Sequence, residues 1–141
     1  MKILLAVDGS KDSLDAVQYV IDHAEWLRDK PVIEVVTVQP PLPQLPGIKM
    51  LGRQTLDRYY QEEGEKRLVP AKQKLDAADV AYEARVIVGA IAETLVKHAK
   101  NGAHDLICIG SRGLGGVAGA LLGSTATKVL HLSDVPVLLV K

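Results

Sequence analysis

The chain opens with a short apolar run that stops at polar residues. In residues 2–7, every residue after Lys2 is apolar, and the sequence Asp-Gly-Ser follows at positions 8–10. Such an uninterrupted run is typical of a strand buried on both faces of a parallel sheet. Over residues 14–27, apolar positions then recur every three or four residues, which predicts a helix with one buried face. Ser10 and Asp12 are candidate caps for this helix.

The same alternation of strand and helix patterns continues to the end of the chain. Further strands are predicted over residues 32–38, 82–88, 105–109 and 135–140, and further helices over 91–99 and 124–132. Residues 39–52 contain four prolines, which remove backbone donors, so an irregular loop is expected there. Residues 55–78 are mostly helix formers, although Gly64 and Pro70 should bend or break that helix.

Five strands that alternate with helices define the fold class. Parallel strands joined by right-handed helical crossovers give an α/β, doubly wound fold with helices on both faces of the sheet. We expect one domain over residues 1–141, with a five-stranded parallel sheet in the order 3-2-1-4-5. Such sheets bind their ligands beyond the carboxyl ends of the strands, where the strand order reverses. The turns after the first and fourth strands should therefore carry the function.

Composition and charge narrow the class of function. Seventeen Lys and Arg residues balance seventeen Asp and Glu residues among 141, so no net charge draws the chain to nucleic acid or to an anionic membrane. No apolar run is long enough for a secretory signal core or a membrane span, which predicts a cytoplasmic protein. Cys108 has apolar neighbours and no second cysteine, so it should be an inert core thiol. The four histidines lie at no metal-binding spacing and are expected mostly on the surface.

Half of the glycines are concentrated after the fourth strand. Six of the twelve lie at positions 110, 113, 115, 116, 119 and 123. Such a cluster indicates a backbone that takes positive φ or lets a ligand approach closely, and phosphate is the commonest such ligand. Gly123 precedes Ser124 and Thr125 at the start of a predicted helix, where unpaired N–H groups attract an anion. The alternative is a flexible hinge with Ser124 as an ordinary helix cap.

Several familiar motifs do not account for this stretch. A Walker loop needs a lysine between its last glycine and its hydroxyl residue, but Gly123 precedes Ser124 directly. Residues 113–118 match the dinucleotide pattern G-x-G-x-x-A, yet they follow the fourth strand, so we treat the match as chance. A hydrolase triad is unsupported, because neither Ser111 nor Ser124 lies in a G-x-S-x-G turn.

What does match is the spacing Gly110-x2-Gly113-x9-Gly123-Ser124, together with the apolar start of the chain that ends in Asp-Gly-Ser. With these features the whole chain resembles the universal stress protein family. The resemblance is to the branch that carries G-x2-G-x9-G-[ST] and binds ATP. It implies that Gly110 and Gly113 let the backbone wrap the phosphates. It also implies that Gly123, Ser124 and Thr125 donate hydrogen bonds to them.

Arg112 and the first two strands complete the expected site. The Arg112 guanidinium either reaches a phosphate or is merely solvated on the loop. Asp8 either accepts from a ribose hydroxyl, or holds a metal-bound water on Mg²⁺ or Mn²⁺, or caps the first helix. Ala6 and Val7 would line the pocket. The resemblance also implies that main-chain groups of Val38 recognise the adenine edge.

These features predict an ATP-binding regulatory protein of the stress response, with slow hydrolysis or none. Three or four donors to phosphate support micromolar binding, at about −8 kcal/mol. Efficient phosphoryl transfer needs in addition a cationic clamp and a group that orients the nucleophile. Two alternatives stay open. One is a dimeric interaction module that binds no nucleotide, and the other is a nucleotide hydrolase that uses the same pocket.

The last strand predicts the oligomeric state. Residues 135–140 form a short apolar strand near the end of the chain, and an exposed sheet edge of this kind tends to pair with another chain. The family resemblance likewise implies a homodimer through this strand. In the alternative, Pro136 and Lys141 protect the edge in a monomer.

Overall fold

The computed structural model describes residues 1–26, 30–114 and 122–141. Within them, five strands form one sheet, in the order β3-β2-β1-β4-β5, and all neighbouring strands are parallel. The strands are β1 (Lys2–Ala6), β2 (Val32–Gln39), β3 (Tyr82–Val88), β4 (Leu106–Gly110) and β5 (Val137–Val140). The predicted α/β class, the five-stranded parallel sheet and its strand order are thereby confirmed.

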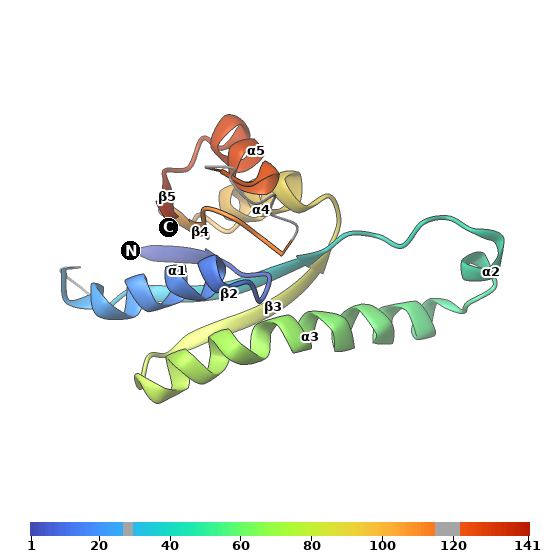
Figure 1. The fold of residues 1–141 in the computed structure, drawn as a ribbon, viewed down its shortest axis with the longest axis horizontal. Coiled ribbons are helices and arrows are strands. Elements are labelled where there is room, and N and C mark those ends of the chain that lie inside the picture. The colour runs from blue at the N-terminus through green and yellow to red at the C-terminus, as the bar shows by residue number, and fades with distance from the viewer. Residues whose placement is uncertain (27–29, 115–121) are drawn as a thin grey trace.

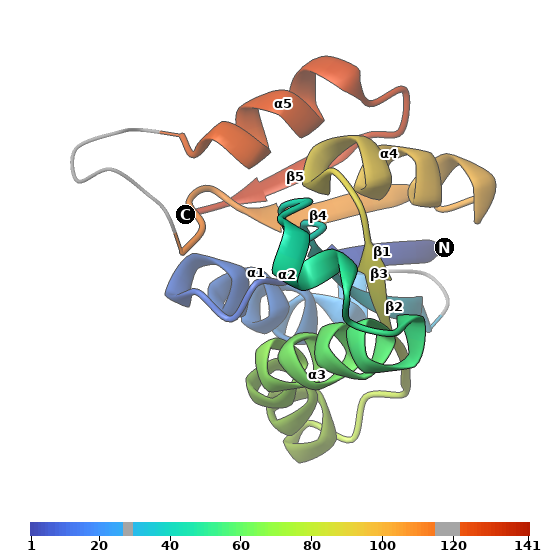
Figure 2. The same ribbon diagram turned by 90° about the vertical axis from the view of Figure 1, so that its right-hand side faces the viewer.

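Helices cover both faces of this sheet, as predicted. They are α1 (Lys11–Asp22), the short 3-10 helix η1 (Ala24–Trp26), α2 (Pro46–Lys49), α3 (Arg53–Ala77), α4 (Ile91–Asn101) and α5 (Ser124–Leu132). Helices α1 and α3 lie on one face, and α4 and α5 on the other (Figures 1 and 2). Helix α1 is shorter than predicted because the chain tightens into η1, and position 27 lies outside the described residues.

Alternation along β1 divides the core between the two faces of the sheet. Ile3 and Leu5 pack toward α1 and α3, whereas Leu4 and Ala6 pack toward α4 and α5. Strand β1 is central in the sheet, between β2 and β4, and helices cover both faces of the sheet, so both faces of β1 are buried. This explains its uninterrupted apolar sequence. Cys108 on β4 belongs to the same core, and burial raises the pKa of its thiol to about 12, as expected for an inert cysteine.

Helix α3 differs most from the sequence prediction. It is one continuous helix of 25 residues, so of the bend or break expected at Gly64 and Pro70 the break does not occur. Gly64 has a packing role instead: a Cβ atom there would lie 2.4 Å from Cγ1 of Val86 on β3. Glycine therefore lets the helix approach the sheet closely. Burial of Leu68 and Leu75 on either side of Pro70 offsets the backbone hydrogen bond that proline cannot make.

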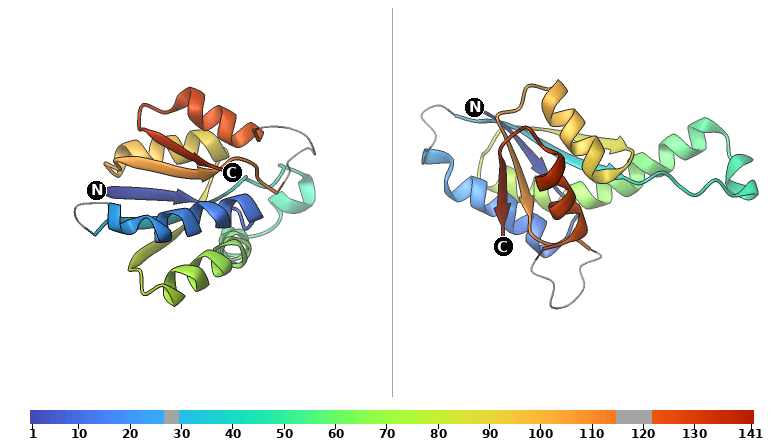
Figure 3. Two further views of the ribbon diagram at one scale, coloured as in Figure 1. Left: turned by 60° about the vertical axis from the view of Figure 1, so that its left-hand side comes forward. Right: turned by 90° about the horizontal axis from the view of Figure 1, so that it is seen from above.

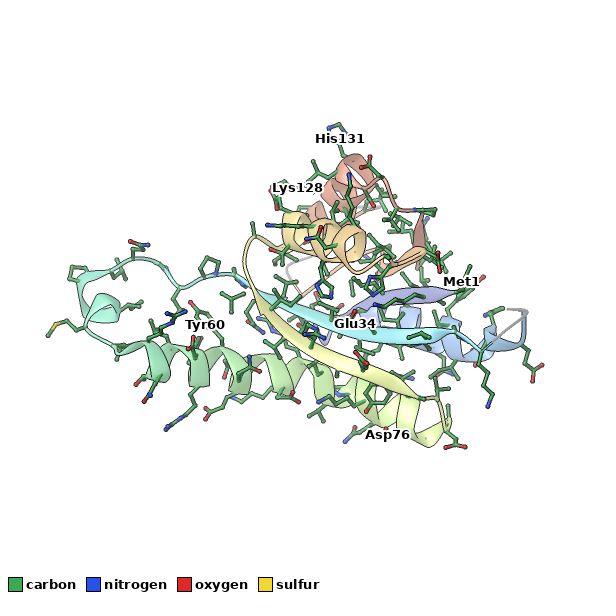
Figure 4. All side chains as sticks on the ribbon, turned by 180° about the vertical axis from the view of Figure 1, so that it is seen from behind. Met1, Glu34, Tyr60, Asp76, Lys128 and His131 are labelled. Atoms are coloured by element: carbon green, nitrogen blue, oxygen red, sulfur yellow. The ribbon has the colours of Figure 1, made fainter. Side chains whose placement is uncertain are left out.

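The first turns of α3 and the segment before it extend beyond the sheet as an arm, defined here as residues 40–60 (Figures 1 and 3). The predicted irregular loop lies in this arm and contains the short helix α2. The hydroxyl of Tyr60 on α3 accepts a hydrogen bond from the backbone N–H of Leu42 at 2.7 Å, which joins the two sides of the arm (Figure 4). None of the helices in the described part of the chain is both long and apolar enough to cross a membrane.

The last strand is shorter than predicted. It begins at Val137, because Val135 donates its N–H to the hydroxyl of Ser133 at 3.1 Å and so belongs to the preceding turn. Pro136 has no N–H and contributes only its carbonyl oxygen, which accepts from Ile107 at 2.9 Å.

A buried polar cluster on β2 was not predicted. Glu34 is 4% exposed and lies on the face that α4 covers (Figure 4). Its Oε1 accepts from Nε of Arg85 at 2.8 Å and lies 3.0 Å from Nε2 of His98. Nε2 of His104 lies 2.9 Å from the other oxygen, an ion-pair distance without hydrogen-bond geometry. His104 is itself 5% exposed, so the predicted surface position is wrong for this histidine.

Burial and hydrogen bonding compete in this cluster. Burial by itself raises the pKa of Glu34, but hydrogen bonds from His98 and Arg85 outweigh it, and the pKa of this carboxyl lies below its usual value. For His104, burial is the largest influence, and its pKa lies below the usual histidine value. The folded state therefore favours a charged Glu34 beside a neutral His104 near pH 7.

Candidate functional site

A cleft of about 420 Å³ lies at the carboxyl ends of β1, β2 and β4. Doubly wound sheets bind their ligands at this edge, next to the point where the strand order reverses. All ten residues predicted from the sequence line the cleft: Ala6, Val7, Asp8, Val38, Gly110, Arg112, Gly113, Gly123, Ser124 and Thr125. The structure thus brings the predicted site together from three strand ends and the start of α5, while the role of each residue toward a ligand stays a prediction.

Other lining residues had not been predicted. They include Arg67 of α3, Pro40 after β2, and Ile91 and Leu95 of α4. No local pattern marks them as site residues, because the apolar ones follow the ordinary helical or loop pattern and Arg67 lies in a helix rich in charged side chains. Only the packing of α3 and α4 on opposite faces of the sheet brings them to one cleft.

Asp8 joins the turns that follow β1 and β4. Its Oδ1 accepts from the backbone N–H of Ser10 at 2.9 Å, and its Oδ2 accepts from the N–H of Leu114 at 3.0 Å. The cap of α1 is Ser10, whose hydroxyl accepts from the N–H of Ser13 at 3.3 Å. Asp8 is therefore not the helix cap. Burial raises the pKa of Asp8, but hydrogen bonds from Ser10 and Leu114 outweigh it, and the pKa lies below its usual value.

Asp12 holds the residues that follow β4. Its residue exposure is 7%, and its Oδ2 accepts from the hydroxyl of Ser111 at 2.9 Å and from Nε of Arg112 at 3.0 Å. The hydrogen bond from Arg112 is the largest influence on the Asp12 carboxyl and holds its pKa below the usual range. Sequence reasoning offered Arg112 as a phosphate ligand or as a solvated side chain. In the structure it forms an ion pair with α1 and still borders the cleft.

Two of the motif glycines are explained by contacts within the protein. A Cβ atom at Gly110 would lie 2.4 Å from the carbonyl carbon of Asp12, and one at Gly113 would lie 2.5 Å from Oδ2 of Asp8. Neither glycine has positive φ; among described glycines only Gly9 does, at 83°. Of the two explanations predicted for the glycine cluster, positive φ therefore does not apply at these two positions. Glycines 115, 116 and 119 lie outside the described residues.

The start of α5 borders the opposite wall of the cleft. Gly123 is the N-cap and supplies no side-chain hydrogen bond, and its own N–H donates to the carbonyl of Ser111 at 2.7 Å. Ser124, Thr125 and Ala126 follow it and line the cleft. Backbone N–H groups in the first turn of a helix have no intrahelical acceptor, and they carry the positive end of the helix dipole. This end of the cleft suits an anion.

The other end of the cleft, at β2, is lined mainly by apolar residues, and β2 presents a main-chain edge there. The carbonyl of Val36 accepts from the N–H of Val7, so the peptide groups of Val36 face β1. The peptide groups of Val38, two residues later, face the same side. The pairing of β1 with β2 ends at Ala6 and Val36, so among the described strands none is paired with Val38 on that side. These groups can receive the edge of a flat polar ring.

Metal ligands do not gather in the cleft. In residues 1–26, 30–114 and 122–141, no three His, Cys, Asp or Glu side chains come together at metal-binding distances. Both oxygens of Asp8 already accept backbone hydrogen bonds. A divalent ion would therefore depend on oxygen ligands that a bound molecule brings.

Comparison with known proteins agrees with this geometry. The model of the universal stress protein family matches residues 1–141. Universal stress protein YxiE of Bacillus subtilis (strain 168) is 34% identical over 149 residues, which cover 99% of this chain and 98% of that protein.

Two solved structures share both fold and moderate sequence identity with the chain. Hypothetical protein MJ0577, whose structure was used to assign its biochemical function, is 27% identical with a TM-score of 0.80, covering 99% of this chain and 94% of that one. A universal stress protein in complex with cAMP is 27% identical with a TM-score of 0.72, covering 100% and 97%. Because the family model spans the full sequence and a relative is one-third identical over its whole length, this chain belongs to the universal stress protein family.

Proposed function

We propose that this protein binds ATP in the cleft and acts as a nucleotide-dependent regulatory protein of the stress response. The observation that carries the proposal is the pairing of two features in one cleft. The main-chain edge of Val38 suits an adenine ring, and the uncapped start of α5 at Ser124 suits phosphates. A family member of 27% identity has been solved in complex with cAMP, which supports a nucleotide as the ligand.

Hydrolysis of the bound nucleotide should be slow or absent. Asp8 is the acidic residue among the described lining, and hydrogen bonds hold its pKa below the usual value, which makes it a weak general base. The Arg112 guanidinium is held through its Nε by Asp12, which restricts its movement toward charge on a leaving phosphate. Mg²⁺ or Mn²⁺, if required, would be held by phosphate oxygens, with Asp8 contacting it through water.

Titration calorimetry with ATP tests the proposal. We expect wild-type protein to bind ATP with a dissociation constant in the micromolar range, and Ser124→Ala to weaken binding about tenfold, because it removes one donor to a charged acceptor. Thr127→Ala is the matched control: Thr127 also lies on α5, but its hydroxyl donates to the carbonyl of Gly123 at 3.0 Å and it does not line the cleft.

Analysis of the nucleotide released from denatured protein separates the alternatives. ATP in the supernatant of freshly purified protein supports the proposal. No released nucleotide, together with no binding at millimolar ATP, would favour a dimeric interaction module. Rapid saturable turnover of ATP would favour a nucleotide hydrolase.

We also propose a homodimer through β5, which lies at one edge of the sheet and carries the half-buried apolar residues Val137, Leu138 and Leu139. An edge strand presents unpaired backbone groups, and a second copy can pair with them. Light scattering should therefore give about 30 kDa, twice the chain mass of 15.2 kDa. A mass near that of one chain would show that the edge is protected in a monomer.

A further inference from the structure

Arg67 is a cation of the cleft wall that the protein itself leaves unpaired. Two cationic side chains, Arg67 and Arg112, are found among the described lining residues. Arg112 is bound to Asp12 at 3.0 Å. Arg67, by contrast, forms no ion pair or hydrogen bond with any residue in the described ranges, although it is only partly exposed. Leaving a half-buried guanidinium without a partner costs folding free energy unless a ligand or water accepts its hydrogen bonds.

The position of Arg67 is set by rigid neighbours. Leu68, the next residue, is fully buried against the sheet, and Gly64, one turn earlier, lets α3 sit closely on β3. On its other side, the turn after β1 comes near: a Cβ atom at Gly9 would lie 3.7 Å from Cα of Arg67. The backbone of Arg67 is therefore held at the border between α3 and the turn after β1.

This border lies on the β2 side of the cleft. Helix α3 packs on β2, β3 and α1, whereas the phosphate-binding groups proposed above belong to the turn after β4 and to α5. The strand order places β1 between the two sides. From this order we infer that Arg67 lies nearer to the apolar Val38 and Pro40 than to Ser124, all of which line the cleft.

Building on the proposed function, we infer that Arg67 contacts the nucleoside end of the ligand and lies over the face of its base. A guanidinium is planar and weakly hydrated, so it stacks on an aromatic ring and is attracted to its electron-rich face. The base would then be held between an apolar wall and this cation, with its edge at the peptide groups of Val38. Arg67 becomes an affinity-determining residue for the base and not for the phosphates.

Three ligands that share one nucleoside test this assignment. We expect Arg67→Met to weaken the binding of adenosine, AMP and ATP by the same factor, about fivefold to thirtyfold. Methionine keeps an apolar stem of similar length beside Gly9 but loses the charged plane. Arg67→Lys should also weaken the binding of adenosine, because an ammonium group keeps the positive charge but lacks the planar group that stacks on the base.

Lys66→Met is the control, since Lys66 is the adjacent cation on α3, pairs with Glu63 at the surface and does not line the cleft. It should leave all three affinities unchanged, and urea unfolding should show each variant to be folded. Equal affinities for wild type and Arg67→Met would overturn this inference but not the proposed function. A loss that grows from adenosine to ATP would overturn it too, by placing Arg67 at the phosphates. Wild-type protein that binds none of the three ligands would overturn the proposed function and this inference together.

Discussion

Gly110→Ala is expected to destabilise the fold by about 3 kcal/mol or more, the upper part of the range for overpacked sites. The new Cβ would lie 2.4 Å from the carbonyl carbon and 2.5 Å from the carbonyl oxygen of Asp12, and 2.6 Å from the nitrogen of Ser13. All three are backbone atoms in the first turn of α1, so no side-chain rotation relieves the clash. Either α1 or the end of β4 must shift. Urea unfolding followed by circular dichroism measures the loss.

Two other glycines provide controls for Gly110→Ala. Gly47 in α2 has nothing within 4 Å of its Cβ position, and Gly47→Ala should change the free energy of unfolding by less than about 0.5 kcal/mol. In Gly123→Ala the nearest atom to the new Cβ would be Cα of Arg112, at 3.3 Å. Its loss of stability should therefore lie between those of Gly47→Ala and Gly110→Ala. If Gly110→Ala were as stable as wild type, the first turn of α1 would not be held against β4, and the packing role assigned to this glycine would be wrong.

Glu34→Ala is expected to lower the free energy of unfolding by about 3 kcal/mol, because it removes a buried, hydrogen-bonded carboxylate and leaves a cavity. The substitution leaves His104, whose side chain is fully buried, without its carboxylate, and it opens a cavity on β2. We expect no larger loss, because His104 is neutral near pH 7 and because the Arg85 side chain is 54% exposed and can turn to water. Chemical denaturation at pH 7 provides the measurement.

Glu83 is the matched control for Glu34. It is the directly opposite residue on β3, but its side chain is 76% exposed and lies 4.0 Å from Arg85. Glu83→Ala should therefore cost less than about 0.5 kcal/mol. Equal losses for the two glutamates would contradict a special role for the buried cluster.

The acid dependence of stability is a second readout of the same cluster. The pKa values of both His104 and Glu34 are lowered in the folded state, so the unfolded chain takes up protons first as the pH falls. The contribution of this cluster to stability is then complete above about pH 6.5, the ordinary histidine value, and is lost on acidification, with a further loss as the pH falls below about 4.5. Lys2 and His98 also face this cluster. Stability that rises between pH 7 and pH 5.5 would contradict the cluster as described.

Sequence patterns were sufficient for the architecture. Uninterrupted apolar runs marked the parallel strands, because a strand buried on both faces needs apolar residues at every position. Apolar positions three or four residues apart marked the helices, because a helix that covers the sheet buries only one face. The order of strands and the turns at their carboxyl ends then located the candidate site, and the ten residues predicted for it all border one cleft. The glycine spacing also pointed to the correct family.

Only the tertiary structure showed which contacts require particular residues at their positions. Gly110 accommodates the backbone of Asp12, Gly64 accommodates Val86, and Arg112 pairs with Asp12. Glu34 and His104 meet although they lie in separate elements, and α3 continues through Pro70 because its buried side chains hold it on the sheet. These contacts join positions far apart in the chain. Periodicity and propensity report how each residue relates to its near neighbours, whereas a long-range contact depends on how whole elements pack, and no single segment records that packing.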